Sequence, residues 1–150
     1  MSLEIQLRRL GRELRNYQLG VFWKIPEEMT QTPCDFIGHT TIGRAILIEA
    51  KEVNRTSLPI NDSPGLLPHQ WNALLEANLA NALTFICWAR QGTCATITMD
   101  MALRLSKDRL SIPWDKIGDR FKRPYLGAGN HLTLLEPWMS PAAALERLRS

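Results

Sequence analysis

Apolar and polar residues follow two periods along this chain, and the change of period marks its helices and strands. Near the start, apolar residues recur at the spacing of one helix face: Leu3, Leu7, Leu10, Leu14 and Tyr17. This pattern predicts a helix over about 2–19. The patterning that follows predicts this order of elements: strands over 20–25, 34–39 and 44–52, a helix over 67–81, and strands over 83–89 and 93–98.

The pattern is weaker after Asp100, where the sequence predicts shorter elements. We expect helical structure over 101–107, a short helical turn over 113–118, a loop over 127–130 and a terminal helix over 142–149. No repeat or linker interrupts the 150 residues, so the sequence predicts a single domain over 1–150 that is large enough to bury a core. The predicted fold class is α/β, with a mixed β-sheet flanked by helices.

The predicted strand over 44–52 carries the most informative chemistry. Ile46, Leu47 and Ile48 place apolar side chains on both faces of the strand, which is typical of a central strand covered on both sides. Glu49 and Lys51 then point to one face, about 6–7 Å apart along the strand. Charged groups in such a place need an ionic partner or a metal ion.

A second carboxylate is expected beside Glu49. Asp35 lies fourteen residues earlier and opens the run Asp-Phe-Ile-Gly, and residues 39–43 have the composition of a turn. A hairpin would therefore bring Asp35 next to Glu49. Two carboxylates with a backbone carbonyl form an all-oxygen site suited to Mg²⁺ or Mn²⁺, and Lys51 would lie at its rim. The chemistry expected of this set is metal-dependent phosphodiester hydrolysis.

The same residues also fit a purely structural interpretation. Glu-x-Lys on a strand is often a solvated ion pair at the end of a sheet. Asp before a turn is ordinary turn chemistry. The residue pattern alone leaves both interpretations open.

The neighbouring segments resemble a known family. Residues 49–60, which read Glu-Ala-Lys-Glu and then Thr-Ser-Leu-Pro, closely resemble RecU-type Holliday-junction resolvases of the PD-(D/E)XK nuclease superfamily. The segment 23–26 resembles the family's Lys-x-Pro element, and 68–70 resembles its His-Gln helix start. The resemblance spans roughly residues 3–90. It implies a restriction-endonuclease-like fold and a Mg²⁺-dependent endonuclease that resolves four-way DNA junctions, with Mn²⁺ able to substitute.

Two features depart from the family pattern. Cys34 is inserted between Pro33 and Asp35, where the family motif reads Pro-Asp. Only residues 27–34 separate the Lys-Ile-Pro element from Asp35, whereas RecU proteins of the usual kind carry a long stalk there. This compact form is similar to archaeal or phage junction-cleaving enzymes, and the sequence leaves a bacterial or a phage origin open.

The resemblance implies roles for further residues. Asp35, Glu49 and Lys51 correspond to the catalytic set, and Gln70 corresponds to a glutamine that supports it, although a glutamine at a helix start often has no such role. The family also has a metal-binding acid on its first helix. Glu4 and Glu13 lie on opposite flanks of the apolar stripe, so at most one can face the metal. The resemblance favours Glu4 as a ligand beside Asp35 and Glu49.

Basic and hydroxyl side chains near these motifs are candidates for phosphate contacts. The predicted DNA-binding residues are Arg8, Arg12, Lys24, Arg55, Thr56, Ser57 and His69. The net charge is only +3, so the distribution of charge is more informative than its sum. A second basic region over 107–123 is interleaved with Trp114, Phe121 and Tyr125, and this mixture suits either DNA strands or a packed subdomain.

Partners and location follow from the same observations. The two-fold pseudosymmetry of a Holliday junction requires two cuts, which predicts a homodimer with two active sites. No apolar run is long enough to span a membrane, and the three cysteines show no metal-ligand spacing, so we expect a cytoplasmic protein with reduced thiols. Two alternatives stay open: a nuclease of the same fold that cuts duplex, flap or single-stranded DNA, and a non-catalytic junction-binding accessory.

Overall fold

The computed structural model describes residues 2–26, 32, 34–41, 43–107 and 110–125. The elements follow in this order: α1 (Leu3–Asn16), β1 (Gly20–Lys24), β2 (Phe36–Thr40), β3 (Ala45–Glu52), β4 (Ser57–Pro59), α2 (Pro68–Leu79), β5 (Leu83–Arg90), β6 (Thr93–Thr98), α3 (Met99–Ser106), β7 (Ser111–Pro113), the 3₁₀ turns η1 (Trp114–Lys116) and η2 (Asp119–Phe121), and β8 (Lys122–Pro124). The predicted elements up to residue 118 are present, with ends shifted by a few residues. The predicted loop over 127–130 and helix over 142–149 lie outside the described residues.

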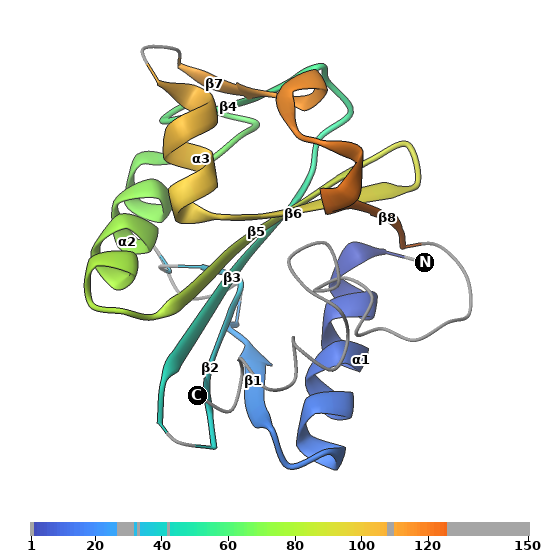
Figure 1. Cartoon of the computed structure of the whole chain (residues 1–150), viewed down its shortest axis with the longest axis vertical. Coiled ribbons are helices and arrows are strands. Elements are labelled where there is room, and N and C mark those ends of the chain that lie inside the picture. Colours follow the sequence, from blue (N-terminus) through green and yellow to red (C-terminus); the bar gives the residue numbers. More distant parts are fainter. Residues whose placement is uncertain (1, 27–31, 33, 42, 108–109, 126–150) are drawn as a thin grey trace.

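One six-stranded mixed sheet organises the molecule (Figure 1). Its strand order is β1-β2-β3-β5-β6-β8, in which β3 and β5 run parallel and the other neighbours are antiparallel. The strands β4 and β7 form a separate small antiparallel sheet, and these two strands and β8 were not predicted. β3 therefore lies inside the main sheet, as its apolar pattern predicts.

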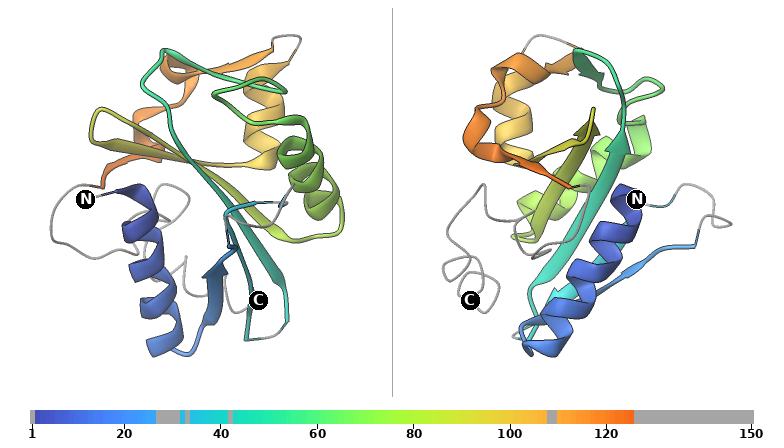
Figure 2. Two further views of the ribbon diagram at one scale, coloured as in Figure 1. Left: turned by 180° about the vertical axis from the view of Figure 1, so that it is seen from behind. Right: turned by 90° about the vertical axis from the view of Figure 1, so that its right-hand side faces the viewer.

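Helices cover both faces of this sheet (Figure 2). The leucines of α1 pack on one face against Phe22, Phe36, Ile46 and Ile48. On the other face α2, α3 and the small sheet pack around Leu47, Trp88 and their neighbours. This arrangement confirms the predicted α/β fold class, a mixed sheet flanked by helices.

Trp88 and the three cysteines are all buried in the structure. Trp88 is fully buried and its indole Nε1 donates a hydrogen bond of 2.7 Å to the carbonyl oxygen of Val53, which confirms its expected place in the core. Cys34, Cys87 and Cys94 are buried free thiols, as expected. No helix in the described part of the chain is long and apolar enough to cross a lipid bilayer.

The N-terminus of α1 is tied to the end of β3. Ser2 is the N-cap, and its hydroxyl accepts a hydrogen bond from the backbone N–H of Ile5. The N–H of Leu3, at the first helical position, donates to Glu52 Oε1 at 2.9 Å. Glu52 therefore places a carboxylate at the positive end of the helix, where negative charge is stabilising.

We expect Glu52→Ala to lower the free energy of unfolding by about 1 kcal/mol, because one N-terminal donor of α1 loses its acceptor. Chemical denaturation monitored by circular dichroism measures this difference. Glu52→Gln, which retains an oxygen acceptor, should recover part of the loss and serves as the matched control. Equal stability of the alanine variant and the wild-type protein would show that the Leu3 contact does not stabilise the helix.

Candidate active site

β3 presents different chemistry on its two faces. Ile46 and Ile48 face the core beneath α1, and Leu47 faces the core beneath α2. Strand alternation therefore puts Glu49 and Lys51 on the α2 side. Glu49 has no solvent exposure, and the ammonium of Lys51 lies 3.3 Å from its Oε1. The predicted carboxylate and ammonium thus form one ion pair in an interior strand, with Glu49 buried and Lys51 partly exposed.

Asp35 is fixed against this pair by three hydrogen bonds. Its N–H donates to the carbonyl oxygen of Ile48, and its carboxylate Oδ2 accepts from the N–H of Ala50 at 2.8 Å. Its own carbonyl oxygen accepts from Ile25 at 2.7 Å. Asp35 thus contacts the two residues that flank Glu49. The predicted β2–β3 hairpin is present, and it brings both carboxylates to one place.

The environment of Glu49 is that of an anion without a sufficient partner. Burial, followed by the negative charge of Asp35, raises the pKa of Glu49 from 4.5 to about 8, although the ammonium of Lys51 opposes the shift. Among the described residues, neither carboxylate oxygen accepts a well-formed hydrogen bond. A buried carboxylate with unsatisfied oxygens beside a second carboxylate is the chemistry that a hard divalent cation satisfies. The two acids therefore fit such an ion.

Cys34 is a neighbour of the site that the sequence reasoning left without a role. It is buried, and its Sγ donates to the carbonyl oxygen of Phe36 at 3.0 Å. Burial and then the charge of Glu49 raise the pKa of the Cys34 thiol to about 12. The thiol therefore stays neutral beside the acids and adds no further negative charge. Its position directly before Asp35 was the available signal.

The helix acid Glu4 lies on the wall of a neighbouring pocket. This pocket has a volume of about 260 Å³, and Glu4, Asp35 and Glu52 line it together with Lys24. Glu4 Oε1 is 3.7 Å from the ammonium of Lys24 and 3.8 Å from the guanidinium of Arg8. Glu4 thus shares a pocket with Asp35 while it is paired with cations, and its role as a metal ligand stays a prediction.

The described residues do not form a complete ligand cluster. No group of three or more His, Cys, Asp or Glu side chains among them is placed to hold a metal ion. Glu13, the other helix acid that the sequence left open, lies on the opposite flank of α1 and is half-buried. The acids that do converge are Asp35 and Glu49.

The predicted residues at the start of α2 have a structural contact. Gln70 Oε1 accepts a hydrogen bond of 3.0 Å from the backbone N–H of Leu67, so its carbonyl group caps the helix. The amide nitrogen is left to donate to a phosphate, and the second lone pair of Oε1 is left to accept from the Lys51 ammonium. His69 is partly exposed on the first turn of the same helix. The catalytic role of Gln70 and the DNA contact of His69 stay predictions.

The candidate phosphate-binding residues fall into separate places. Arg8, Arg12 and Lys24 line one groove between α1 and β1. Arg55 and Thr56 are exposed in the turn after β3, and Ser57 begins β4. The structure therefore brings the first three together and places the others on the segment that leaves the catalytic strand.

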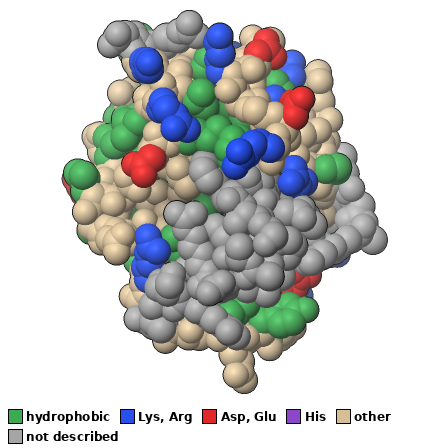
Figure 3. Space-filling model, viewed as in Figure 1, with side chains coloured by type: hydrophobic (Ala, Val, Ile, Leu, Met, Phe, Trp, Pro, Cys, Tyr) green, Lys and Arg blue, Asp and Glu red, His purple; other side chains and the backbone are tan. Residues whose placement is uncertain are grey.

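The second basic region is at least partly a packing arrangement. Figure 3 shows Lys and Arg side chains around an apolar area over the half of the molecule that holds α3, β7, η1 and η2. Arg90 and the ammonium of Lys122 lie 5.5 Å and 4.8 Å from the ring centroid of Trp114, which packs edge-on against Trp88. Such cation–π contacts stabilise the aromatic core, which favours the packed subdomain over a DNA surface at Trp114.

Comparison with known proteins finds a likeness to solved structures but none to a family model or a curated sequence. No model of a protein family matches the chain, and no curated protein matches its sequence. Among solved structures, the chain is similar to Hjc of Archaeoglobus fulgidus, a Holliday junction resolvase from an archaeal hyperthermophile. The TM-score is 0.48 and the sequence identity is 17%, over 76% of this chain and 88% of that chain. An archaeal Holliday junction resolvase is therefore among the structural neighbours of this protein.

Proposed function

We propose that this protein is a metal-dependent endodeoxyribonuclease that resolves four-way DNA junctions. The observation that carries the proposal is the fully buried carboxylate of Glu49, which Asp35 and Lys51 flank in an interior strand. A carboxylate in this position destabilises the fold unless a cation binds it. A perturbed acid with a second acid and a lysine beside it is typical of a catalytic site.

The residues of the site have distinct tasks in phosphodiester hydrolysis. Glu49 and Asp35 would hold Mg²⁺, or Mn²⁺ in its place, and the pocket acid Glu4 is the candidate for a further ligand. When bound, the ion supplies positive charge that favours deprotonation of water and offsets charge on the phosphate. The ammonium of Lys51 is held at the Glu49 carboxylate, where it orients the attacking water or stabilises the extra negative charge of the transition state.

The proposal that the enzyme selects four-way junctions rests on the resemblance of its sequence to a resolvase family. The order of the Lys-x-Pro element, Asp35, the Glu-x-Lys strand and the His-Gln helix start resembles RecU-type resolvases over roughly 3–90. Resolution of a junction with two-fold pseudosymmetry requires one cut in each of two strands, so we propose that the active form is a homodimer.

The proposal predicts paired nicks in a labelled four-way junction in the presence of Mg²⁺, none in EDTA, and little cutting of a linear duplex of the same sequence. Mapping the products on a denaturing gel measures the positions of the nicks. Cuts at symmetric positions in opposing strands would support resolution by two active sites. Equal cutting of the linear duplex would instead indicate a general nuclease, and tight binding without cutting would indicate an accessory protein.

A further inference from the structure

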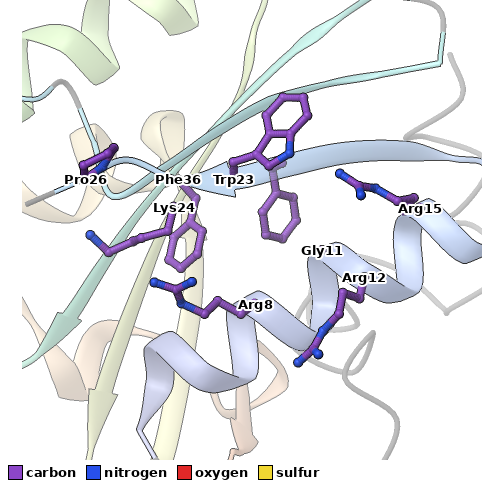
Figure 4. A pocket seen from close by; sticks show the side chains of 9 residues that line it. Arg8, Gly11, Arg12, Arg15, Trp23, Lys24, Pro26 and Phe36 are labelled. Atoms are coloured by element: carbon purple, nitrogen blue, oxygen red, sulfur yellow. The ribbon is translucent and has the colours of Figure 1, made fainter.

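A groove of about 580 Å³ runs between α1 and β1 (Figure 4). Its basic residues come from both elements: Arg8, Arg12 and Arg15 from α1 and Lys24 from β1. Figure 4 shows Arg8 and Arg15 reaching from the helix toward the strand, while Arg12 turns to the outer side. Arg15 was not among the residues predicted to contact DNA.

The positive charge of this groove is largely unbalanced. Among the residues that the structure describes, no acidic side chain lines it. Arg8 has one exposed contact of 3.8 Å with Glu4 at the end of the groove, and neither Arg12 nor Arg15 forms an ion pair with a described residue. Several cations held together without carboxylate partners repel one another, and a polyanion relieves this repulsion.

The floor of the groove is aromatic and close to the helix. Phe22 and Phe36 pack edge-to-face with their ring centroids 5.7 Å apart, and both line the groove. Gly11 lets the helix approach, because a Cβ atom at this position would lie 3.0 Å from the Phe22 ring. An apolar floor below a row of cations suits a sugar–phosphate chain, which has both kinds of surface.

The spacing of the cations matches a linear polyanion. The helical rise of 1.5 Å per residue places Arg8, Arg12 and Arg15 along about 10 Å of the helix axis. At 100° per residue all three lie on one side of α1, whereas Arg9 is turned about a quarter of a circle away. The three arginines therefore leave the helix along the groove, with the Arg12 guanidinium on its outer side.

This groove joins the pocket that Glu4, Asp35 and Glu52 line. Lys24 and Phe36 line both the groove and the pocket that contains Glu4 and Asp35. The ammonium of Lys24 is held at this junction, 2.9 Å from the carbonyl oxygen of Ile25 and 3.7 Å from Glu4 Oε1. A chain that lies along α1 therefore passes Lys24 and reaches Asp35.

We propose that this groove binds the sugar–phosphate backbone of one DNA strand and directs it past Lys24 to Asp35. The inference rests on the proposed nuclease function and adds the path of the cut strand. Arg12 and Arg15 contact phosphates away from the cut, and Lys24 positions the strand where the groove meets the pocket. The bases of this strand face away from the arginines, so the groove reads no sequence.

The test is the salt dependence of junction binding by Arg12→Ala/Arg15→Ala, with Arg9→Ala as the matched control on the same helix. Fluorescence anisotropy in EDTA, between roughly 50 and 200 mM salt, gives the slope of log K against log[salt]. Loss of two phosphate contacts should make the slope shallower by roughly 1.4–1.8. Arg9→Ala should retain the wild-type slope, and thermal melts of all three proteins should agree.

A second measurement locates the strand. Neutral methylphosphonates are placed one at a time on either side of the mapped cut, and affinities are compared for the wild-type protein and the double variant. Substitutions at a few adjacent phosphates of one strand should weaken wild-type binding, and they should have little added effect on the double variant. Additive effects at every position, or a double variant that behaves like Arg9→Ala, would overturn the groove proposal.

The outcomes separate this inference from the nuclease proposal. If the wild-type protein cuts junctions while the double variant retains the wild-type slope, the nuclease proposal stands and the groove proposal is wrong. If the wild-type protein binds with an arginine-dependent slope but never cuts with Mg²⁺ or Mn²⁺, the groove proposal stands and the nuclease proposal is wrong. Absence of DNA binding by the wild-type protein would overturn both.

Discussion

Cutting of a labelled four-way junction should fall on the order of 10³-fold or more when Glu49 is replaced by glutamine. Glutamine has nearly the same shape but cannot provide the charge that a divalent cation requires. Lys51→Ala should also abolish cutting, because the ammonium beside Glu49 is lost. Both variants should retain most of their junction affinity, since phosphate contacts elsewhere supply most of the binding. Single-turnover cleavage and anisotropy measure the two quantities.

Glu76→Gln is the matched control, because Glu76 is an exposed glutamate of α2 that lies outside the proposed catalytic set. It should cut at the wild-type rate. Strong cleavage by either Glu49→Gln or Lys51→Ala would show that the catalytic residues lie elsewhere.

Without metal, the stability of the wild-type protein should fall relative to that of Glu49→Gln as the pH rises from about 4.5 to about 8. The folded protein holds the Glu49 proton until about pH 8, whereas the unfolded chain releases it near 4.5. The folded state therefore binds more protons within this window, and the contribution of Glu49 to the free energy of unfolding decreases as pH rises. Glutamine does not titrate, so Glu49→Gln lacks this pH-dependent contribution to the free energy of unfolding.

Thermal melts in EDTA at about pH 5 and about pH 8 measure the difference. The melting temperature of Glu49→Gln should gain several degrees on the wild-type protein across this range, since each 1 kcal/mol corresponds to about 2–4 °C in a protein of this size. Mg²⁺ at the higher pH should raise the melting temperature of the wild-type protein again, because an ion that binds the ionised acids stabilises the folded state. It should leave the melting temperature of Glu49→Gln unchanged. Parallel pH profiles of the two proteins would contradict the proposed burial of an ionisable Glu49.

The sequence predicts the fold well where apolar periodicity is continuous. The leucine stripe of α1 and the doubly apolar run of β3 both lie where their patterns predict. The three-residue strands β4, β7 and β8 were missed, because so few residues cannot show an alternating pattern. They arise from pairing between distant segments, such as Ser57 with Pro113, which no local signal reports.

In the candidate site, too, local sequence predicts some contacts, whereas others depend on segments that are distant in the chain. Asp35 and Glu49 could be brought together from the sequence because a short hairpin joins their strands. The surroundings of Glu4 could not, because its contact with Lys24 depends on the packing of α1 beside β1. Arg15 and Glu52 were missed for a related reason. Their roles come from a groove and a helix end that only the folded arrangement of α1 and the sheet creates.

The bond from Leu3 to Glu52 limits how this site can be moved to another protein. The last residues of β3 carry Glu49 and Lys51 on one side and the acceptor for α1 on the other. A designer who grafts only β3 onto a new scaffold would leave Glu52 without its helix and would lose Asp35, which precedes β2. The smallest portable unit is therefore the β2–β3 hairpin with Asp35, together with the first turn of α1.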